Sequence, residues 1–223
     1  MGVGDSIQDG EAMKEHPLLL SAPMVLAAIE GRKHVTRRIL SKRNTIIDGK
    51  PWSKSKCKWN DLDFNSAELH YGDLLVDSLS LDDPHILTPI YRPGDVVWFK
   101  ETWFQGYATV YRADHPDCGP SGDPCDKWKS SIFMPRWASR LVRPVIGSRI
   151  EYVQDITEEQ AKTEGVAWFS TEGTETEKRF VAEKFPDGYR TNFMLLWDLL
   201  CPKPGLWWKD NPLVVAVEFG DAV

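Results

Sequence analysis

The sequence predicts an α+β protein, a small mixed β-barrel with flanking helices and loop insertions. Three observations lead to this fold class. Several short segments have the apolar pattern of strands, helices with their own start and stop residues stand between them, and turn-forming residues separate the elements. Short strands interrupted by helices favour a small barrel over a parallel, doubly wound sheet.

The first element follows residues 1–16, which read as a flexible tail because they are rich in glycine and then in charge. A helix is predicted to begin at Ser21, a favourable N-cap residue, with Pro23 in its first turn. Gly31 is a natural end for that helix. Residues 41–72 are polar and irregular, and we expect them to form a long insertion.

The central strands are predicted from β-branched and aromatic runs next to turns. Residues 73–81 partly alternate and favour a strand, and the turn at 92–95 leads into a strong strand at 96–99. Residues 107–111 read as the hairpin partner of that strand. Residues 140–153 predict a strand that a proline and a glycine interrupt.

The last third of the chain predicts helices and a final strand. Residues 157–160 (TEEQ) form a capping box that starts a helix ending near Gly165. Further helices are expected at 174–185 and 190–200, the latter with apolar residues at helical spacing. Residues 213–219 (LVVAVEF) predict the last strand.

Length and composition indicate one domain, residues 17–223, with insertions near 41–72 and 157–200. The 223 residues are 42% hydrophobic and 27% charged, which is an ordinary globular composition. No apolar run approaches the roughly 20 residues that span a bilayer, and no secretory leader is evident. We therefore expect a cytoplasmic protein without a membrane partner. The sequence does not predict an oligomeric state.

Charge is distributed unevenly. The net charge is −6, and residues 151–187 alone account for all of it. Residues 32–43 carry six bases and no acid: Arg32, Lys33, Arg37, Arg38, Lys42 and Arg43. A focused basic strip on an acidic protein can attract a phosphate locally. The alternative is a solvated basic loop, part of which lies at a helix C-terminus, where cations are favoured.

Cysteine spacing and known motifs exclude the simplest metal and cofactor assignments. Six residues separate Cys118 from Cys125 in a loop, whereas zinc ligands are usually closer and number four. The sequence contains no P-loop, dinucleotide fingerprint or Gly-x-Ser-x-Gly motif. We expect incidental thiols, no metal and no cofactor.

Three residues are candidates for catalysis. Lys33 and Thr36 stand in a Lys-x-x-Thr-x-Arg pattern, in which a lysine of lowered pKa can activate a hydroxyl. Phosphate anchoring or simple solvation is the alternative. Glu101 lies between two tryptophans, where partial desolvation would raise its pKa and suit it to proton transfer. It could equally be a solvated carboxylate or one paired with an arginine.

The segment Met134-Pro135-Arg136-Trp137-Ala138-Ser139-Arg140 combines two arginines with a tryptophan. Such a segment can bind phosphate while an indole ring stacks on a base. A strand edge with one core tryptophan is the alternative. Most of the ten tryptophans are expected in the core, because aromatic side chains dominate burial energetics.

These segments together resemble an ASCH-domain protein of the PUA-like superfamily, of the kind common in bacteriophages and prophages. The resemblance spans about residues 17 to 219. Its pieces are short, but they occur in a specific order: SAPM at 21–24, GRKxxTRR at 31–38, RPGD at 92–95, WxxETW at 98–103, YRAD at 111–114, MPRWASR at 134–140, QDI at 154–156, LWD at 196–198 and NP at 211–212.

The resemblance implies a small PUA-like barrel with a cleft flanked by helices. PUA-like domains generally bind RNA or modified bases, and some ASCH proteins are amidohydrolases that deacetylate acetylcytidine. Lys33 and Thr36 match the Lys-x-x-Thr pair of those enzymes, and Arg38 matches a following arginine. Where they have a glutamate, alignment places Arg143 or Pro144 here. Other ASCH relatives are ribonucleases.

Three functions follow as hypotheses. In the first, the cleft binds RNA or a modified nucleoside; Trp103 or Trp137 stacks a base, Glu101 accepts hydrogen bonds from an amine, and the basic contacts come from Arg32, Lys33, Arg37, Arg38, Arg136 and Arg140. In the second, Thr36 is a nucleophile, Lys33 its activator and Glu101 a proton shuttle in amide or phosphodiester hydrolysis. In the third, the chain is a phage morphogenetic or interaction protein. The first two require Lys33 and Glu101 to line one hollow.

Overall fold

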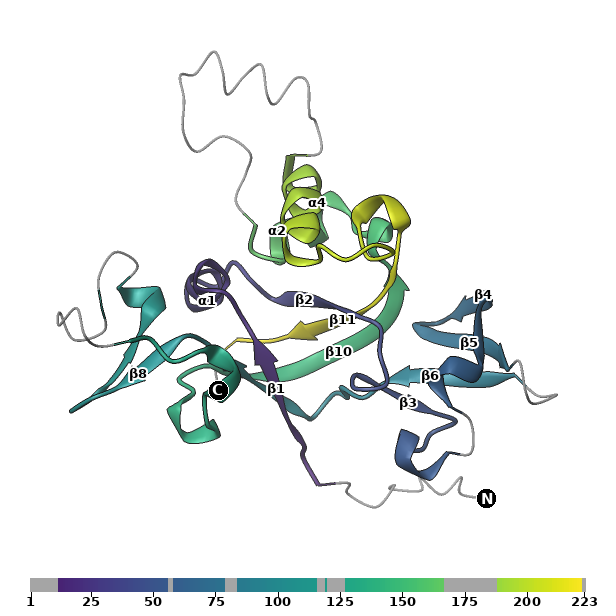
Figure 1. Cartoon of the computed structure of the whole chain (residues 1–223), viewed down its shortest axis with the longest axis horizontal. Coiled ribbons are helices and arrows are strands. Elements are labelled where there is room, and N and C mark those ends of the chain that lie inside the picture. Colours follow the sequence, from purple (N-terminus) through teal and green to yellow (C-terminus); the bar gives the residue numbers. More distant parts are fainter. Residues whose placement is uncertain are drawn as a thin grey trace, which may run out of the picture.

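A computed structural model describes residues 12–55, 58–78, 84–115, 119, 127–166 and 188–221. Its described part is an α+β structure built mainly from sheets, with a few short helices on one side (Figure 1). The predicted fold class therefore holds at this level.

A five-stranded sheet forms the centre of the structure. Its strand order is β1 (Glu15–Leu19), β7 (Val96–Lys100), β10 (Val142–Tyr152), β11 (Leu213–Phe219) and β2 (Val35–Ile39). The pair β1–β7 is parallel and the other three pairs are antiparallel. β10 changes register between Val145 and Gly147, which agrees with the predicted interruption of this strand.

The sheet does not close into a barrel, so the predicted barrel is not confirmed. β1 and β2 are the two edge strands, and no backbone ladder joins them among the described residues. The contact between these edges comes from a side chain, because the Arg38 guanidinium donates a hydrogen bond to the backbone carbonyl of Leu19.

A second, four-stranded sheet corrects the prediction of an irregular insertion at 41–72. Its order is β3 (Thr45–Ile47), β6 (His85–Pro89), β5 (Asp73–Ser78) and β4 (Leu62–His70), all antiparallel. Ile47 and Leu62 are buried in the main core. Each strand of this sheet contributes only a few buried apolar residues to the core. Because polar residues surround them in the sequence, the strand pattern was not recognised.

A two-stranded hairpin, β8 (Trp103–Gln105) and β9 (Thr109–Tyr111), lies at one end of the molecule (Figure 1). The expectation that residues 107–111 pair with 96–99 is wrong. β7 is already paired on both sides, with β1 and β10, and the chain turns back on itself only after Gln105.

The helices begin where the sequence predicts. α1 (Ala22–Ile29) has Ser21 as its N-cap and proline in its first turn. α2 (Glu158–Thr163) has the predicted capping box between Thr157 and Gln160. α4 (Gly188–Leu200) buries Phe193 and Trp197. The helix predicted at 174–185 falls outside the described residues.

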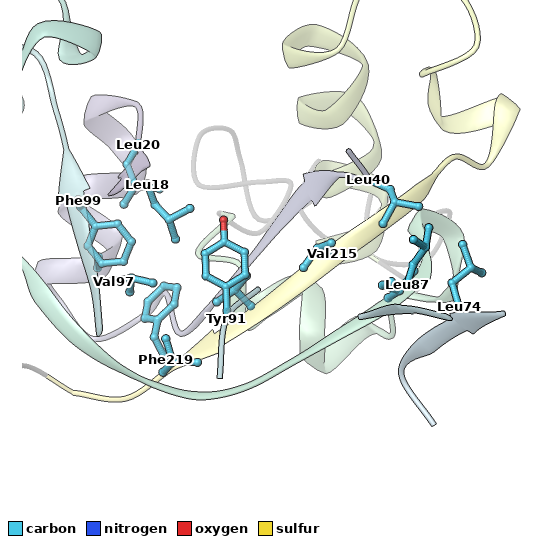
Figure 2. Close-up of a cluster of buried hydrophobic side chains, with 14 of the residues drawn as sticks. Leu18, Leu20, Leu40, Leu74, Leu87, Tyr91, Val97, Phe99, Val215 and Phe219 are labelled. Atoms are coloured by element: carbon cyan, nitrogen blue, oxygen red, sulfur yellow. The ribbon is translucent and has the colours of Figure 1, made fainter. Parts of the chain in front are cut away.

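The main hydrophobic core joins the two large sheets. Figure 2 shows Tyr91 between Phe99 and Phe219 on one side and Leu40, Leu74 and Leu87 on the other. A second cluster packs α2 and α4 on the opposite face of β11, where Val214 meets Phe193 and Trp197. β11 is thus apolar on both faces, which explains its continuous apolar run.

Two further observations bear on the domain boundaries and on membranes. β1 begins at Glu15, so the last two residues of the expected tail belong to a strand. Among the described residues, every helix is too short or too polar to cross a lipid bilayer.

Candidate functional site

A cavity of about 450 Å³ lies beside edge strand β2. Its walls come mainly from the residues between the end of β1 and α1, from Lys33 and β2, and from the apolar side of α4, and the end of α2, Thr102 and Ser131 complete them. The polar side chains that line it are Ser21, Lys33, Thr36, Arg37, Arg38, Thr102, Ser131 and Glu164. The volume lies in the range of small-molecule sites, about 300–1,000 Å³.

Lys33 is buried between α1 and β2. The chain reverses after α1 at Gly31, whose φ of +70° is one that glycine adopts readily. The Lys33 ammonium donates to the carbonyl of Val35 at 2.7 Å, to the carbonyl of Glu164 at 2.8 Å and to Glu164 Oε2 at 2.7 Å. Burial lowers the pKa of Lys33, while the charge and hydrogen bond of Glu164 oppose that change.

Glu164 is the acidic residue that lines this cavity, and it was not among the residues predicted from the sequence. Glu164 is the C-cap residue of α2, where the helix dipole disfavours a carboxylate. An acid at this unfavourable position was the one sign in the sequence that Glu164 has a partner elsewhere in the fold. Gly165 allows the close approach, since a Cβ there would lie 2.8 Å from Ala27 Cβ and 2.9 Å from Lys33 Cβ.

Arg37 links Lys33 and Glu164 to a longer chain of charges. Its guanidinium bonds Glu164 Oε1 at 3.1 Å, Glu151 Oε1 at 2.6 Å and Gln160 Oε1 at 3.1 Å. Glu151 in turn accepts from Arg149, which also pairs with Glu218. Positive and negative groups alternate along this chain, as buried charges require.

Half of the predicted basic strip is withdrawn from solvent: Lys33, Arg37 and Arg38 line the cavity, while Arg32, Lys42 and Arg43 are exposed. Lys33 and Arg37 are only 3% and 4% exposed, and both are neutralised by acids that lie far away in the sequence. Arg38 lines the cavity, and burial lowers its pKa against the opposing charges of Glu164, Tyr91 and Cys201. Arg32 lies outside the cavity and pairs with Glu30.

Thr36 lies in the cavity wall with 2% exposure. Among the described residues, its hydroxyl has no hydrogen-bond partner. The cavity thus brings together an unengaged hydroxyl, a lysine of lowered pKa and a carboxylate. Lys33 and Thr36, which were predicted to share a site, both line this cavity.

Glu101 does not line this cavity, so the predicted hollow shared by Lys33 and Glu101 is wrong. Arg140 holds the Glu101 carboxylate with two hydrogen bonds, at 2.9 and 3.1 Å, and also binds Asp114. Burial raises the pKa of Glu101, although the hydrogen bond and charge of Arg140 oppose it. The arginine-paired alternative was the correct one, and only the neighbouring Thr102 reaches the cavity.

The other predicted contact residues lie around the Glu101 cluster. Trp103 is buried and packs with Met134 and Ala138, so its ring has no free face for a base. Trp137 is 66% exposed and meets Trp103 edge-on at 5.7 Å. Arg136 pairs with Glu15 at 2.6 Å. Of the predicted stacking residues, Trp137 alone is accessible.

Metal ligands do not gather anywhere in the part of the chain that the structure describes. Of the four cysteines only Cys201 lies in that part, as a free thiol in the cavity wall. Cys118 and Cys125 lie outside the described residues.

Comparisons of this chain with protein-family models, with curated proteins and with solved structures found no match. The resemblance to ASCH domains therefore remains a prediction from the sequence motifs.

Proposed function

We propose that the cavity binds a nucleoside-sized ligand and hydrolyses an amide bond on it. The observation that carries this proposal is that Lys33, Thr36 and Glu164 line one cavity of about 450 Å³. A hydroxyl, a base and an orienting acid are the groups that amide hydrolysis through a covalent intermediate needs.

Glu164 replaces Glu101 as the acid of the proposed site, and it orients Lys33 where Glu101 was expected to shuttle protons. The deacetylases that this chain resembles use a Lys-x-x-Thr pair and a downstream glutamate, whose usual strand position holds no acid here. Glu164 supplies a carboxylate 2.7 Å from the Lys33 amine, from the end of a helix. In this proposal the carboxylate of the motif comes from a different place in the sequence, and the same three chemical groups are still present.

The reaction would begin when the Thr36 oxygen attacks the amide carbonyl carbon and its proton passes to neutral Lys33. The carbon–nitrogen bond breaks, and that proton leaves with the amine. Water then attacks the acyl ester on Thr36; its hydroxyl joins the acyl group, and its second proton returns to the Thr36 oxygen through Lys33. Glu164 orients the lysine throughout.

Binding without turnover is the second candidate. All three protons of the Lys33 ammonium already have acceptors within 2.8 Å, and the Arg37 guanidinium donates to two acids and an amide. Groups held this firmly can recognise a carbonyl by shape and charge without moving a proton.

The deciding experiment incubates the protein with acetylcytidine, and with short RNAs that carry it, and follows release of acetate by mass spectrometry. Thr36→Val removes the proposed nucleophile at nearly constant volume. Thr102→Val makes the same change on another wall of the same cavity. We expect turnover by the wild type and Thr102→Val, and a loss of about 100-fold or more in Thr36→Val.

Saturable binding of acetylcytidine with no turnover would contradict hydrolysis and support the second candidate, which is binding alone. The absence of both, together with a co-purifying protein, would favour the phage interaction protein considered from the sequence.

A further inference from the structure

We propose that the cavity beside β2 contains a phosphate subsite, formed by Arg38 and the start of α1, so that its ligand is a nucleotide and not a neutral nucleoside. This inference rests on the function proposed above and names the class of ligand that the same cavity takes. Arg38, Ser21 and Met24 all line that cavity. The catalytic steps written for Lys33 and Thr36 use none of these three residues.

Arg38 is the lining cation that forms no ion pair within the described part of the chain. Among the described residues, Glu164 is the one acid that lines the cavity. Each of its carboxylate oxygens already accepts from another cation, Oε2 from Lys33 at 2.7 Å and Oε1 from Arg37 at 3.1 Å. Glu164 therefore acts on Arg38 only through its charge, from beyond contact distance. A bound anion would supply the partner that Arg38 lacks.

The Arg38 guanidinium has N–H groups available for such an anion. Among the described residues its hydrogen bond goes to the backbone carbonyl of Leu19, whereas a guanidinium carries five N–H groups. Its other nitrogens are not among the buried polar atoms that lack a partner, so they remain accessible. These groups suit a phosphate, which a guanidinium binds through two parallel hydrogen bonds.

The start of α1 adds further donors. Ser21, two residues after Leu19, is the N-cap of α1, and its side chain makes no capping hydrogen bond. The backbone N–H of Met24 also has no partner within the part of the chain that the structure describes. A helix N-terminus has partial positive charge and free N–H groups, both of which favour a phosphate. The bond from Arg38 to Leu19 holds the guanidinium close to this end of the helix.

The rest of the cavity has space for the nucleoside part of the ligand. Leu20, Phe193 and Trp197 give it an apolar wall, and its volume of about 450 Å³ is far larger than an inorganic phosphate needs. The Thr36 hydroxyl is an independent sign of a polar ligand, because it lines the cavity at 2% exposure without a partner among the described residues. A buried hydroxyl without a partner costs free energy that a ligand can recover.

The test measures binding apart from turnover. Isothermal titration with cytidine and with CMP reports binding alone, because neither molecule carries an acyl group. We expect CMP to bind at least about tenfold more tightly than cytidine, with an affinity that weakens as salt is added. A short RNA containing cytidine provides the other source of phosphate. If RNA binds as tightly as CMP, the subsite takes a phosphodiester of a chain; if CMP alone is preferred over cytidine, it takes the free nucleotide. Both results support the subsite.

Arg38→Gln and Arg43→Gln are matched variants, because each removes one positive charge from the same basic strip. Arg43 is exposed and does not line the cavity. Arg38→Gln should weaken CMP binding by about tenfold or more and change cytidine binding by less than about threefold. Arg43→Gln should change both by less than about threefold. A merely structural role of Arg38 would instead weaken both ligands alike.

Ser21→Ala tests the subsite even if Arg38→Gln fails to fold. The Ser21 side chain makes no capping bond, so its loss should leave the fold intact, which circular dichroism checks. We expect this variant to weaken CMP binding by about threefold or more and to leave cytidine binding unchanged.

Three results would overturn the subsite: no preference for CMP or RNA over cytidine, equal weakening of CMP and cytidine by Arg38→Gln, or no saturable binding up to about 10 mM. Turnover assays separate this inference from the function on which it rests. A preference for CMP without release of acetate from acetylcytidine or its monophosphate would contradict hydrolysis and retain the subsite. Release of acetate with equal kcat/KM for these two substrates, together with no preference for CMP, would retain hydrolysis and overturn the subsite.

Discussion

Lys33 and Glu164 lie 131 residues apart in the chain, and the Lys33 ammonium donates to both the carboxylate and the backbone carbonyl of Glu164. This double contact ties the end of α2 to the start of β2. It also places the carboxylate where Arg37 can share it, at 3.1 Å. The candidate site therefore contributes to the stability of the fold as well as to its chemistry.

Glu164→Gln should destabilise the protein by about 3–5 kcal/mol, because it leaves Lys33 and Arg37 buried with less compensating charge. The control is Glu30→Gln, which removes the acid of an exposed pair with Arg32 and should cost about 0–1 kcal/mol. Urea unfolding monitored by circular dichroism gives both values. Equal losses in the two variants would contradict a structural role for the buried network.

The proposed hydrolysis should become faster as the pH rises, because in that mechanism Lys33 acts as a base only after losing its proton. Burial lowers the pKa of Lys33, so the midpoint of this rise should lie below about 10.4, the value for a free lysine. Measuring kcat/KM against pH with acetylcytidine tests this. The rise should persist in Thr102→Val; if Lys33→Met shows the same rise, another group is the base.

Asp95→Asn should cost about 2 kcal/mol of stability at pH 7. Burial raises the pKa of Asp95, but the hydrogen bonds from His16, Lys14 and Arg92 and the charge of His16 outweigh it, so the pKa is lowered overall. A lowered carboxyl pKa contributes stability above the unfolded value of about 3.9, and that contribution is lost as the pH falls through the folded value. The difference between wild type and variant should therefore shrink below about pH 4 in urea titrations.

The two tryptophans at the hairpin should differ sharply when replaced by alanine. Trp103 is 4% exposed, so Trp103→Ala should cost about 3–5 kcal/mol, whereas Trp137→Ala at an exposed position should cost less than about 1 kcal/mol. Thermal unfolding of both variants provides the comparison. If RNA binds, Trp137→Ala should weaken it while the fold stays intact; a stable Trp103→Ala would show that this ring is not core.

Local sequence patterns were sufficient for many elements. The N-cap at Ser21, the capping box at Thr157 and the apolar run of β11 each depend on neighbours within a few residues, and each was predicted correctly. The parallel pairing of β1 with β7 and the second sheet depend on contacts between distant segments. Single-sequence periodicity carries no information on such pairing.

The same distinction explains the candidate site. Lys33 and Thr36 are three residues apart, so a local motif could place them together. Glu164 joins them only through the packing of α2, and Glu101 was assigned to the site on its tryptophan neighbours alone. Its actual partner, Arg140, lies 39 residues further along the chain. The sequence alone therefore could not show that Glu164, and not Glu101, lies beside Lys33.

The unpaired edges of β1 and β2 have a consequence for how the two ends of the central sheet are held together. Among the described residues no ladder bond spans this gap, and a single guanidinium reaches across it to Leu19. Within the described part of the chain, separating these two edges therefore breaks side-chain contacts and no backbone ladder.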